Sequence, residues 1–477
     1  MSIRFGTDGW RAVISEEFTF ANVRLVARAI SDYVKEITGA TGAAVVVGFD
    51  TRFLSDRYAM EVARCMADND LQVYLSNSDC PTPAMAFAIQ HLKAVGGVMV
   101  TASHNPPRYN GLKFKGYHGG PAMPEETRRI EQILERNLAT GLTTASSDWT
   151  LSDGVESYPG ITRFDPMPPY LAHIRTLVDL HAVRAASLKV AVDSMYGAGR
   201  GYISAILRDV GCDVVELHGE MNPGFGGIHP EPIERNLGDL LKVIREGHFD
   251  IGLATDGDAD RIGAVDAQGR FVDPHRIFSL ILHHLLETRS ARGSVVKTVS
   301  TTQLLNKLCQ RYGLPLHETP VGFNYICEWM LKEDVLMGGE ESGGMTVRGH
   351  VPDGDGILMA LFLIELLATQ QEPLHEIVAD LMREYGEFHY GRHDFHTRAF
   401  DKQQLTERLM SEAPERILHH RVVRVNNSDG VKYLLDDDSW LLIRPSGTEP
   451  LLRIYAEAHV QQEVGLLLAA GEHIADI

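Results

Sequence analysis

The sequence is poor in cysteine, and its five cysteines form no recognisable pattern. Cys65, Cys80, Cys212, Cys309 and Cys327 are odd in number and widely spread, and no two of them make a CxxC pair. Neither a disulfide framework nor a cysteine-rich zinc site is therefore indicated. Free thiols are typical of a reducing compartment, so we expect a cytoplasmic protein.

Positive charge and long hydrophobic runs are also scarce. The chain has 45 lysines and arginines against 64 aspartates and glutamates, a net charge of -19. Nucleic acids and anionic membranes attract positive surfaces, so we expect neither as a partner. Residues 1–6 lack an apolar signal core, and the apolar segment 358–368 carries Glu365 and is too short to span a bilayer. A small phosphorylated substrate is compatible with this charge, because it needs only a local positive cleft.

What the sequence does contain is a repeated alternation of strand and helix patterns. Three rounds are predicted, and such alternation implies the βαβ units of an α/β fold. The first round comprises 44–49, 55–68, 71–75, 82–91 and 95–100; the second 188–193, 201–210, 213–217, 233–246 and 251–255; the third 294–299, 301–312, 335–337 and 354–368. A stretch rich in Thr, Ser, Asp, Gly and Pro at 143–169 predicts a linker after the first round.

After about Tyr385 the pattern changes to that of β-hairpins. Short strands are predicted at 421–425, 431–435 and 440–443, with an Asn-Asn-Ser-Asp-Gly turn between the first two, and a closing helix at 461–475. This pattern favours a final α+β unit with an antiparallel sheet. A chain of 477 residues is long enough for three or four domains of ordinary size.

The first chemically informative loop is Thr-Ala-Ser-His-Asn-Pro at 101–106, which carries Ser103 and His104. It directly follows the apolar strand predicted at 95–100, and α/β sheets bind ligands beyond the carboxyl ends of their strands. By itself such a segment is an ordinary surface turn. Its place after a buried strand makes Ser103 a candidate residue of a ligand-binding or catalytic site.

The second loop places three carboxylates, Asp256, Asp258 and Asp260, at alternate positions after the strand predicted at 251–255. A hard divalent cation such as Mg²⁺ prefers these oxygens and keeps positions open for phosphate. Arg261 follows directly, and a guanidinium beside a cation would neutralise a phosphoryl group in transfer. The alternative is a solvated acidic turn, and we expect the similar Asp-Gly-Asp at 353–355 only to cap a helix.

Two later loops offer groups that bind sugars and phosphates. Glu340 and Ser342 lie in the glycine-rich segment 338–344, where their oxygens suit sugar hydroxyls; a mobile loop with solvated glutamates is the alternative. Arg444, with Ser446, Gly447 and Thr448, follows the strand predicted at 440–443 and could cradle a phosphate, unless it is a simple Pro-Gly turn.

Two arginines near the N-terminus complete the candidates. Arg11 ends the segment Phe-Gly-Thr-Asp-Gly-Trp-Arg at 5–11 and could face the phosphoryl site. Arg52 follows Gly-Phe-Asp-Thr at 48–51, and we expect it to pair with a carboxylate and fix loops.

The four loops together resemble those of the α-D-phosphohexomutases. The motifs are Thr-Ala-Ser-His-Asn-Pro (101–106), Thr-Asp-Gly-Asp-Ala-Asp-Arg (255–261), Gly-Glu-Glu-Ser-Gly (339–343) and Arg-Pro-Ser-Gly-Thr-Glu-Pro (444–450). The resemblance extends over nearly the whole chain. It implies an α/β protein of four domains around a central cleft, three similar α/β domains with mixed sheets and a C-terminal α+β domain with an antiparallel sheet. We place them at 1–150, 165–265, 266–382 and 383–477.

The resemblance also implies roles for single residues. Ser103 would be the phosphoserine and, with the three aspartates, would hold Mg²⁺. The other roles are contact with the transferring phosphoryl group or proton transfer for Arg11, Lys113 and Arg261, substrate binding for His104, sugar binding for Glu340 and Ser342, and binding of the second phosphate for Arg444, Ser446, Gly447 and Thr448.

By the same resemblance, the protein would interconvert hexose 1-phosphates and hexose 6-phosphates. The phosphoserine would give its phosphoryl group to a hexose phosphate. The resulting hexose 1,6-bisphosphate, intermediate and activator at once, would turn end for end and return a phosphate to Ser103. Lys113 or Arg11 is the candidate base for the attacking hydroxyl. The sequence leaves open a monomer or a homodimer.

The substrate preference depends on two positions in the third unit. The Gly-Glu-Glu-Ser motif resembles glucose-phosphate mutases, whereas bispecific glucose/mannose and glucosamine types tend to carry histidine where this chain has Gly344. Asn324 departs from the glucose type, which commonly has lysine there. We therefore predict a phosphoglucomutase, with a phosphomannomutase or a bispecific glucose/mannose mutase as the alternative.

Three other classes of protein fit the sequence less well. The glycines at 197–201 suggest a dinucleotide dehydrogenase, but GxGxxG would need glycine where Tyr202 stands. A serine hydrolase would need GxSxG around Ser103. A catalytically silent sugar-phosphate binding protein would need a broken serine or aspartate motif, and both motifs are intact.

Overall fold

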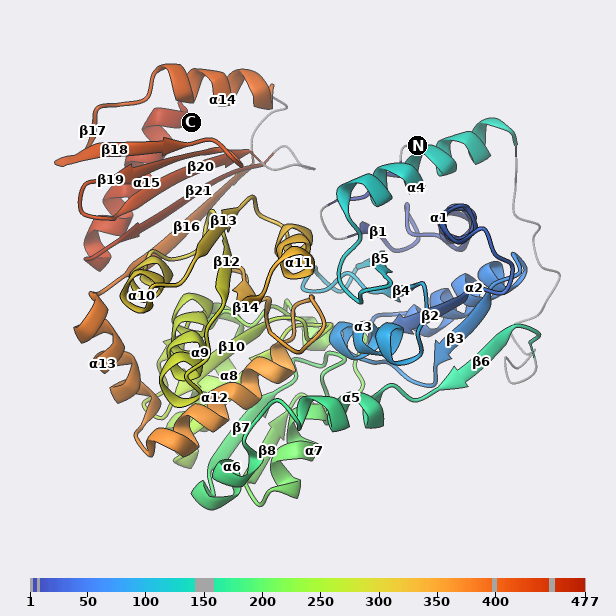
Figure 1. The fold of residues 1–477 in the computed structure, drawn as a ribbon, viewed down its shortest axis with the longest axis horizontal. Helices are drawn as coiled ribbons and strands as arrows, with labels where there is room; N and C mark the ends of the chain where they lie inside the picture. The colour runs from blue at the N-terminus through green and yellow to red at the C-terminus, as the bar shows by residue number, and fades with distance from the viewer. Residues whose placement is uncertain (1–2, 7–8, 142–157, 397–400, 446–450, 477) are drawn as a thin grey trace.

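The computed structural model describes residues 3–6, 9–141, 158–396, 401–445 and 451–476. Within these residues the chain forms four sheets, one in each of four successive domains (Figure 1). The first three sheets mix parallel and antiparallel pairs, and the fourth is antiparallel throughout. The predicted fold class is therefore confirmed.

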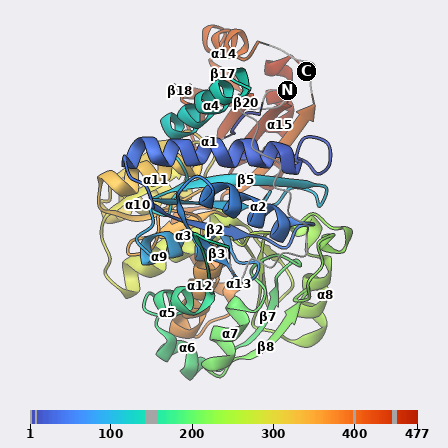
Figure 2. The ribbon, with the colours of Figure 1, turned by 90° about the vertical axis from the view of Figure 1, so that its right-hand side faces the viewer.

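Domain I contains a six-stranded sheet in the order β1-β5-β4-β2-β3-β6. The helices α1 and α4 pack beside each other on the outside of this domain (Figure 2). The elements are β1 (Trp10–Val13), α1 (Phe20–Thr38), β2 (Ala44–Phe49), α2 (Ser55–Ala67), β3 (Gln72–Ser76), α3 (Thr82–His91), β4 (Gly96–Val100), β5 (Tyr109–Gly116), α4 (Pro124–Ala139) and β6 (Ile161–Phe164).

The segment 143–169, predicted as a linker, is only partly one. Its first part falls outside the described residues, but β6 within it pairs in parallel with β3 and extends the first sheet. Four residues are too few for an alternating pattern to stand out among turn-forming neighbours. The next helix, α5 (Met167–Ile174), already begins the second domain.

Domain II has a five-stranded sheet in the order β11-β10-β9-β7-β8. The helix predicted at 233–246 is divided, because Leu237 is fully buried and has a φ of -102°, outside the helical region. The elements after α5 are α6 (Leu180–Ala186), β7 (Lys189–Asp193), α7 (Tyr202–Asp209), β8 (Asp213–Leu217), 3₁₀ turns at Phe225–Gly227 and Glu234–Asn236, α8 (Gly238–Gly247), β9 (Ile251–Thr255), β10 (Ile262–Asp266) and β11 (Phe271–Val272).

Domain III has a four-stranded sheet in the order β13-β12-β14-β15. Its helix α12 is buried from Gly356 to Ala368 and shares one apolar core with domain II. The elements are α9 (Pro274–Thr288), β12 (Ser294–Thr298), α10 (Leu304–Tyr312), β13 (Leu316–Thr319), α11 (Phe323–Lys332), β14 (Val335–Gly339), β15 (Met345–Val347), α12 (Gly356–Gln370) and α13 (Leu374–Tyr385). Among the described residues no single helix could cross a membrane by length and composition; α12 and α13 pass that test only as a pair bent by 86°.

The first three domains repeat one topology. Taking the four strands of each repeat in chain order, the spatial order is fourth, third, first, second: β5-β4-β2-β3, β10-β9-β7-β8 and β15-β14-β12-β13. The first three strands are parallel and are joined by crossovers that contain helices, whereas the fourth turns back beside the third. The short loop between the third and fourth strands thus lies at the carboxyl end of a parallel strand in every domain.

Domain IV is a six-stranded antiparallel sheet in the order β16-β21-β20-β19-β18-β17, packed against α15. Trp440, Leu442 and Tyr455 form an apolar cluster with Val299 of domain III, and this cluster joins the two domains. The elements are β16 (His389–His396), α14 (Lys402–Ser411), β17 (Arg416–Ile417), β18 (His420–Asn426), β19 (Val431–Leu435), β20 (Trp440–Pro445), β21 (Leu451–Ala458) and α15 (Gln461–Ala475).

Candidate functional site

The loops between the third and fourth strands of domains I, II and III converge on one site. The β4–β5 loop carries Ser103, the β9–β10 loop the three aspartates, and the β14–β15 loop Glu340 and Ser342. The hydroxyl of Ser103 donates a hydrogen bond of 2.8 Å to Oδ2 of Asp256. The amide of Ile262 donates to the carbonyl of Gly343 at 3.3 Å, which joins the second loop to the third. The structure therefore brings together loops that lie far apart in the sequence.

Ser103 is held in an unusual backbone conformation. Its φ is 50°, in the left-handed region that residues other than glycine rarely adopt, and only 1% of its surface is exposed. Its amide donates to Oγ1 of Thr101 at 2.8 Å. Such a conformation persists only where the surrounding contacts enforce it, and it is typical of functional loops.

Arg52 provides those contacts. One end of its guanidinium donates to the carbonyls of Ser103 and Asn105, both at 2.6 Å. The other donates to the carbonyls of Pro106 and Tyr109 at 2.9 and 3.0 Å, and Nε pairs with the carboxylate of Asp50 at 3.1 Å. The expectation that Arg52 pairs with a carboxylate and fixes a loop is confirmed.

Asp256, Asp258 and Asp260 point their carboxylates toward one another, with one oxygen of each within 4.8 Å of the others. Lys113 on β5 donates to Asp258 at 2.9 Å and to Asp260 at 3.0 Å, so a domain I lysine anchors the loop of domain II. The hydroxyl of Thr82 donates to the same oxygen of Asp258 at 2.7 Å. The other oxygen of Asp258, Oδ1, is buried and has no hydrogen-bond partner among the described residues.

The electrostatics of this group favour a bound cation. Burial, followed by the charges of Asp260 and Asp258, raises the pKa of Asp256 well above its usual value. Burial opposes ionisation of Asp258 as well, but the Lys113 ammonium and the hydrogen bonds outweigh it and keep that pKa low. Negative charge is therefore under-compensated around Asp256, and a divalent cation would balance it.

The donor set fits Mg²⁺. All three side chains offer carboxylate oxygens, one of these oxygens is buried without a partner among the described residues, and the Ser103 hydroxyl lies beside them. Mg²⁺ prefers such hard oxygen ligands and retains positions for phosphate oxygens. Asp256, Asp258, Asp260 and the Ser103 oxygen are the residues that would hold it.

Three further predicted residues surround Ser103 with positive charge or polar nitrogen. Arg11 on β1 donates to Oδ1 of Asn105 at 2.7 Å, which places it at the serine loop. Arg261 lies 3.8 Å from Asp260 and 3.9 Å from Glu231, and despite burial these carboxylates and Asp256 raise its pKa. His104 Nδ1 is 3.4 Å from the Ser103 hydroxyl.

His104 is a neutral imidazole in this setting. Burial lowers its pKa well below the usual value, and the positive charges of Arg261 and Arg11 lower it further. A neutral ring can donate through one nitrogen and accept through the other. It therefore presents a polar group without adding to the positive charge beside the serine.

In domain III, Glu340 is fixed by the loop before α11. Gly322 donates its amide to Oε1 of Glu340 at 2.9 Å, and the Ser342 hydroxyl lies 3.4 Å from Oε2. Glu341 accepts from the hydroxyl of Ser300 at 2.8 Å. Asn324 is 4% exposed, and its Oδ1 is buried without a hydrogen-bond partner among the described residues.

In domain IV, Arg444 is buried and donates to Oδ2 of Asp429 at 2.7 Å. The same oxygen accepts from the amide of Val321 at 2.9 Å, so Asp429 joins the predicted phosphate loop to domain III. Ser446, Gly447 and Thr448 lie outside the described residues.

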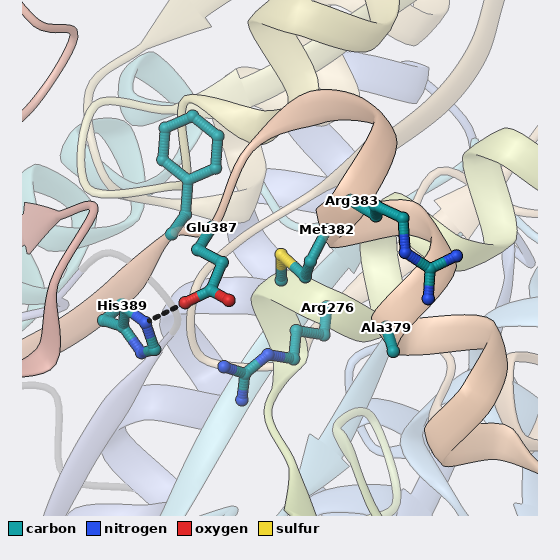
Figure 3. A pocket seen from close by; sticks show the side chains of 7 residues that line it. Arg276, Ala379, Met382, Arg383, Glu387 and His389 are labelled. Carbon is teal, nitrogen blue, oxygen red and sulfur yellow. Dashed lines mark hydrogen bonds and ion pairs between the residues drawn. The ribbon is translucent and has the colours of Figure 1, made fainter.

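The site also contains residues that no sequence motif indicated. Thr82 is simply the first residue of α3, and Asp429 belongs to a β-hairpin turn. Only Asn105 could have been found, because it lies inside the Ser103 motif. A cavity of about 410 Å³ lies elsewhere, where α13 leads into β16 (Figure 3), and no predicted site residue lines it; its lining consists of Arg276, Ala379, Met382, Arg383, Glu387, Phe388 and His389.

Comparison with known proteins gives matches along nearly the whole chain. Family models for the phosphoglucomutase/phosphomannomutase domains match in order: domain I at residues 2–140, domain II at 168–269, domain III at 273–385 and the C-terminal domain at 405–471. A phosphoglucomutase/phosphomannomutase of Thermococcus kodakarensis is 29% identical over 467 residues, covering 98% of this chain and 97% of the relative. A Methanothermobacter thermautotrophicus protein named "Probable phosphoglucosamine mutase" is 31% identical and covers 96% of this chain and 94% of its own.

A solved structure agrees with these matches. The crystal structure of a candidate phosphomannomutase from Thermus thermophilus is 35% identical, superposes with a TM-score of 0.87 and covers 100% of both chains. Fold and site therefore define an enzyme of the α-D-phosphohexomutase superfamily, an isomerase that acts on small phosphosugars. Within that superfamily, the chain belongs to the phosphoglucomutase/phosphomannomutase family.

Proposed function

We propose that this protein interconverts α-D-glucose 1-phosphate and glucose 6-phosphate through a phosphoserine at Ser103 and a hexose 1,6-bisphosphate. The observation that carries the proposal is the hydrogen bond of 2.8 Å between the Ser103 hydroxyl and Asp256, within a buried cluster of three carboxylates. A phosphoryl group on this serine would lie beside the cation site and beside Arg11 and Arg261.

The chain's own residues supply positioning and charge for the transfer. Phosphoryl transfer passes through a loose transition state that needs alignment and neutralisation more than covalent help. Bound Mg²⁺ would supply Lewis-acid neutralisation of the phosphoryl oxygens. Arg52 fixes the serine backbone, while Arg11 and Arg261 contact the phosphoryl group. Lys113 or Arg11 is the candidate base for the attacking sugar hydroxyl, and the side chain that takes this proton must first be deprotonated itself.

Glu340, Ser342 and His104 bind the sugar in this proposal, and Arg444, Ser446, Gly447 and Thr448 hold its second phosphate. That phosphate has to leave Arg444 so that the bisphosphate can turn end for end. Glucose is the first choice because Gly344 stands where the other types tend to carry histidine. We place the enzyme in the cytoplasm, in keeping with five cysteines that are all free and buried. In this proposal it acts as a monomer or a homodimer.

A side-by-side assay decides between the sugars. Mannose phosphate is the first alternative, because mannose differs from glucose only in the configuration of the C2 hydroxyl. Glucosamine phosphate is a second, since several relatives about 30% identical carry the name phosphoglucosamine mutase. Turnover of glucose 1-phosphate, mannose 1-phosphate and glucosamine 1-phosphate should be fastest with glucose, and a faster rate with either other sugar would reassign the substrate.

The phosphoserine can be tested directly. Intact-mass measurement of the purified protein should show a fraction with one added phosphate, which excess substrate removes and which Ser103→Ala lacks. The Ser103→Ala variant should also lose mutase activity. Finding no phosphate on the wild-type protein under any condition, or an unchanged phosphate on Ser103→Ala, would refute the mechanism.

A further inference from the structure

The turn at 353–356 between β15 and α12, which the sequence suggests is only a helix cap, touches all three α/β domains. It does cap α12, since Oδ1 of Asp355 accepts from the amide of Leu358 at 2.8 Å. Oδ2 of Asp355 accepts from the hydroxyl of Tyr170 on α5 at 2.7 Å, which links the turn to domain II. The rest of the turn lies against the loop that carries the three aspartates.

Two glycines allow this close approach to the aspartate loop. A Cβ on Gly354 would lie 2.8 Å from the carbonyl oxygen of Asp260, and one on Gly356 would lie 2.1 Å from that of Arg261. The amide of Gly356 also donates to the carbonyl of Ala259 at 3.1 Å. The turn therefore supports the backbone of the loop that presents the cation ligands.

Domain I holds this turn through a buried ion pair. Lys115 Nζ lies 2.6 Å from Oδ2 of Asp353, and the two side chains are 1% and 3% exposed. Lys115 and Lys113 occupy alternate positions of β5, so they project from the same face of the strand. Lys113 pairs with the aspartate loop directly, and Lys115 pairs with the turn that packs against this loop.

The packing next to this ion pair is equally close. A Cβ on Gly120, in the turn after β5, would lie 2.5 Å from Sγ of Cys327 and 2.6 Å from the carbonyl of Pro352, both in domain III. The His118 ring is 3.4 Å from the same sulfur. The contact between domains I and III leaves little room for the turn to shift.

We propose that Lys115 and Asp353 are positioning residues, which act through the turn at 353–356 to set the aspartate loop against Ser103. The inference rests on the proposed function. Removing one member of the pair takes the 2.6 Å ion-pair contact from a buried charge, and the turn at 353–356 loses its contact with Lys115. A shift of about 1 Å at a transfer site can lower the rate roughly 100-fold.

The test compares three variants with wild type at a temperature where circular dichroism shows each to be folded. Lys115→Met should lower kcat/KM about 100-fold and weaken Mg²⁺ binding about tenfold, the latter measured by isothermal titration calorimetry without substrate. The double variant Lys115→Met/Asp353→Leu removes both charges, so its thermal stability should partly recover. Its Mg²⁺ affinity and kcat/KM should stay low, because the ion pair that joins β5 to the turn at 353–356 is still absent.

Arg289→Met is the matched control. Arg289 pairs with the buried carboxylate of Glu365 on α12, far along the same helix from the turn. This variant should lose stability and keep the wild-type Mg²⁺ affinity and kcat. If Lys115→Met does not fold, the double variant and Asp353→Asn carry the test.

Two results would overturn the inference: wild-type Mg²⁺ affinity and kcat/KM in Lys115→Met, or full recovery of both in the double variant, which would make the pair merely structural. Absence of mutase activity in the wild-type protein would instead reject the proposed function. The two failures are therefore distinguishable.

Discussion

At the scale of single residues, the two carboxylate oxygens of Asp258 differ in their hydrogen bonds. Its Oδ2 accepts from Lys113 and Thr82, whereas Oδ1 is buried without a partner among the described residues. Asp258→Asn keeps the size of the side chain and removes the charge. We expect Mg²⁺ to bind at least about 100-fold more weakly, since even partners behind a metal ligand are worth about 10- to 100-fold, and turnover to fall with it.

Thermal unfolding at increasing Mg²⁺ concentration checks this expectation. A ligand that binds only the folded state stabilises it by about 2.7 kcal/mol at about 100 times its dissociation constant. The wild-type melting temperature should therefore rise with Mg²⁺, and that of Asp258→Asn should not. Asp266→Asn, a change at a buried carboxylate of β10 that binds Arg270, should keep the rise. An equal rise in wild type and Asp258→Asn would remove the metal assignment.

Motifs could predict that Ser103 and the three aspartates are candidate site residues, but not which contacts hold them in place. Ser103 and the three aspartates stand in short, ordered patterns that can be read along the chain. Thr82 and Asp258 are 176 residues apart, and no local pattern relates them. The sequence predicts that Arg52 pairs with a carboxylate and fixes loops. It does not predict the four carbonyl partners of Arg52, which depend on how the β4–β5 loop folds over it.

At the scale of elements, the sequence patterns predicted some strands closely and missed others, among them β5, β10, β15 and β21. The strands β2, β8, β9 and β19 and the helices α3 and α15 have the predicted bounds. The strand β5 was not predicted, although all its residues but the first are buried. Its two lysines interrupt the apolar pattern, and their burial depends on carboxylates from domains II and III.

The turn after β5 should make the protein sensitive to acid. Burial, and then the positive charge of Lys115, lowers the pKa of His118 from 6.5 to about 4. Its folded pKa lies below its unfolded one, so the unfolded chain binds the proton more readily between these values. The contribution of His118 to the free energy of unfolding is complete above pH 6.5 and is lost as the pH falls to about 4. This loss amounts to at most about 3 kcal/mol.

Urea unfolding at several pH values isolates this contribution. His118→Gln removes the titrating ring, so its free energy of unfolding should fall less between about pH 7 and about pH 4 than that of wild type. His181→Gln, on the solvent-accessible helix α6, should follow the wild-type curve. Parallel curves for wild type and His118→Gln would show that the ring does not control acid stability.

At the scale of the whole molecule, domains II and III share one apolar core, and Lys113 and Lys115 bind domain I to both. Domain IV joins domain III through the apolar cluster around Trp440 and through a second contact, which is rich in buried charge. Lys432 donates to Glu318 at 3.1 Å and to the carbonyl of Val299 at 2.7 Å, and Lys297 lies 3.6 Å from the same carboxylate. Burial, with the charge of Lys432, lowers the pKa of Lys297 to about 8.

The carboxylate of Glu318 therefore interacts with two buried ammonium groups, those of Lys297 and Lys432, at the contact between domains III and IV. Glu318→Gln leaves both without it, and breaking a buried pair in this way costs about 3–5 kcal/mol. Because the pair lies between domains, we expect domain IV to separate from domain III before either unfolds. Small-angle scattering should then show a larger radius of gyration, and KM for the hexose phosphate should rise about tenfold, since Arg444 belongs to domain IV.

The residues proposed to hold the cation, Ser103 and the three aspartates, lie in domains I and II. Mg²⁺ binding therefore distinguishes a loosened contact between domains III and IV from general damage. Mg²⁺ affinity and the amount of phosphate that the proposed mechanism places on Ser103 should be unchanged in Glu318→Gln. Glu333→Gln is the control, because it removes an exposed carboxylate that pairs with His317 of the neighbouring strand β13 and should change neither the scattering nor KM. A Glu318→Gln protein as compact as wild type, with an unchanged KM, would show that the apolar cluster around Trp440 holds domain IV without these charges. Weakened Mg²⁺ binding would instead place the damage in the body of the enzyme, since the aspartate loop makes its contacts with domains I and III.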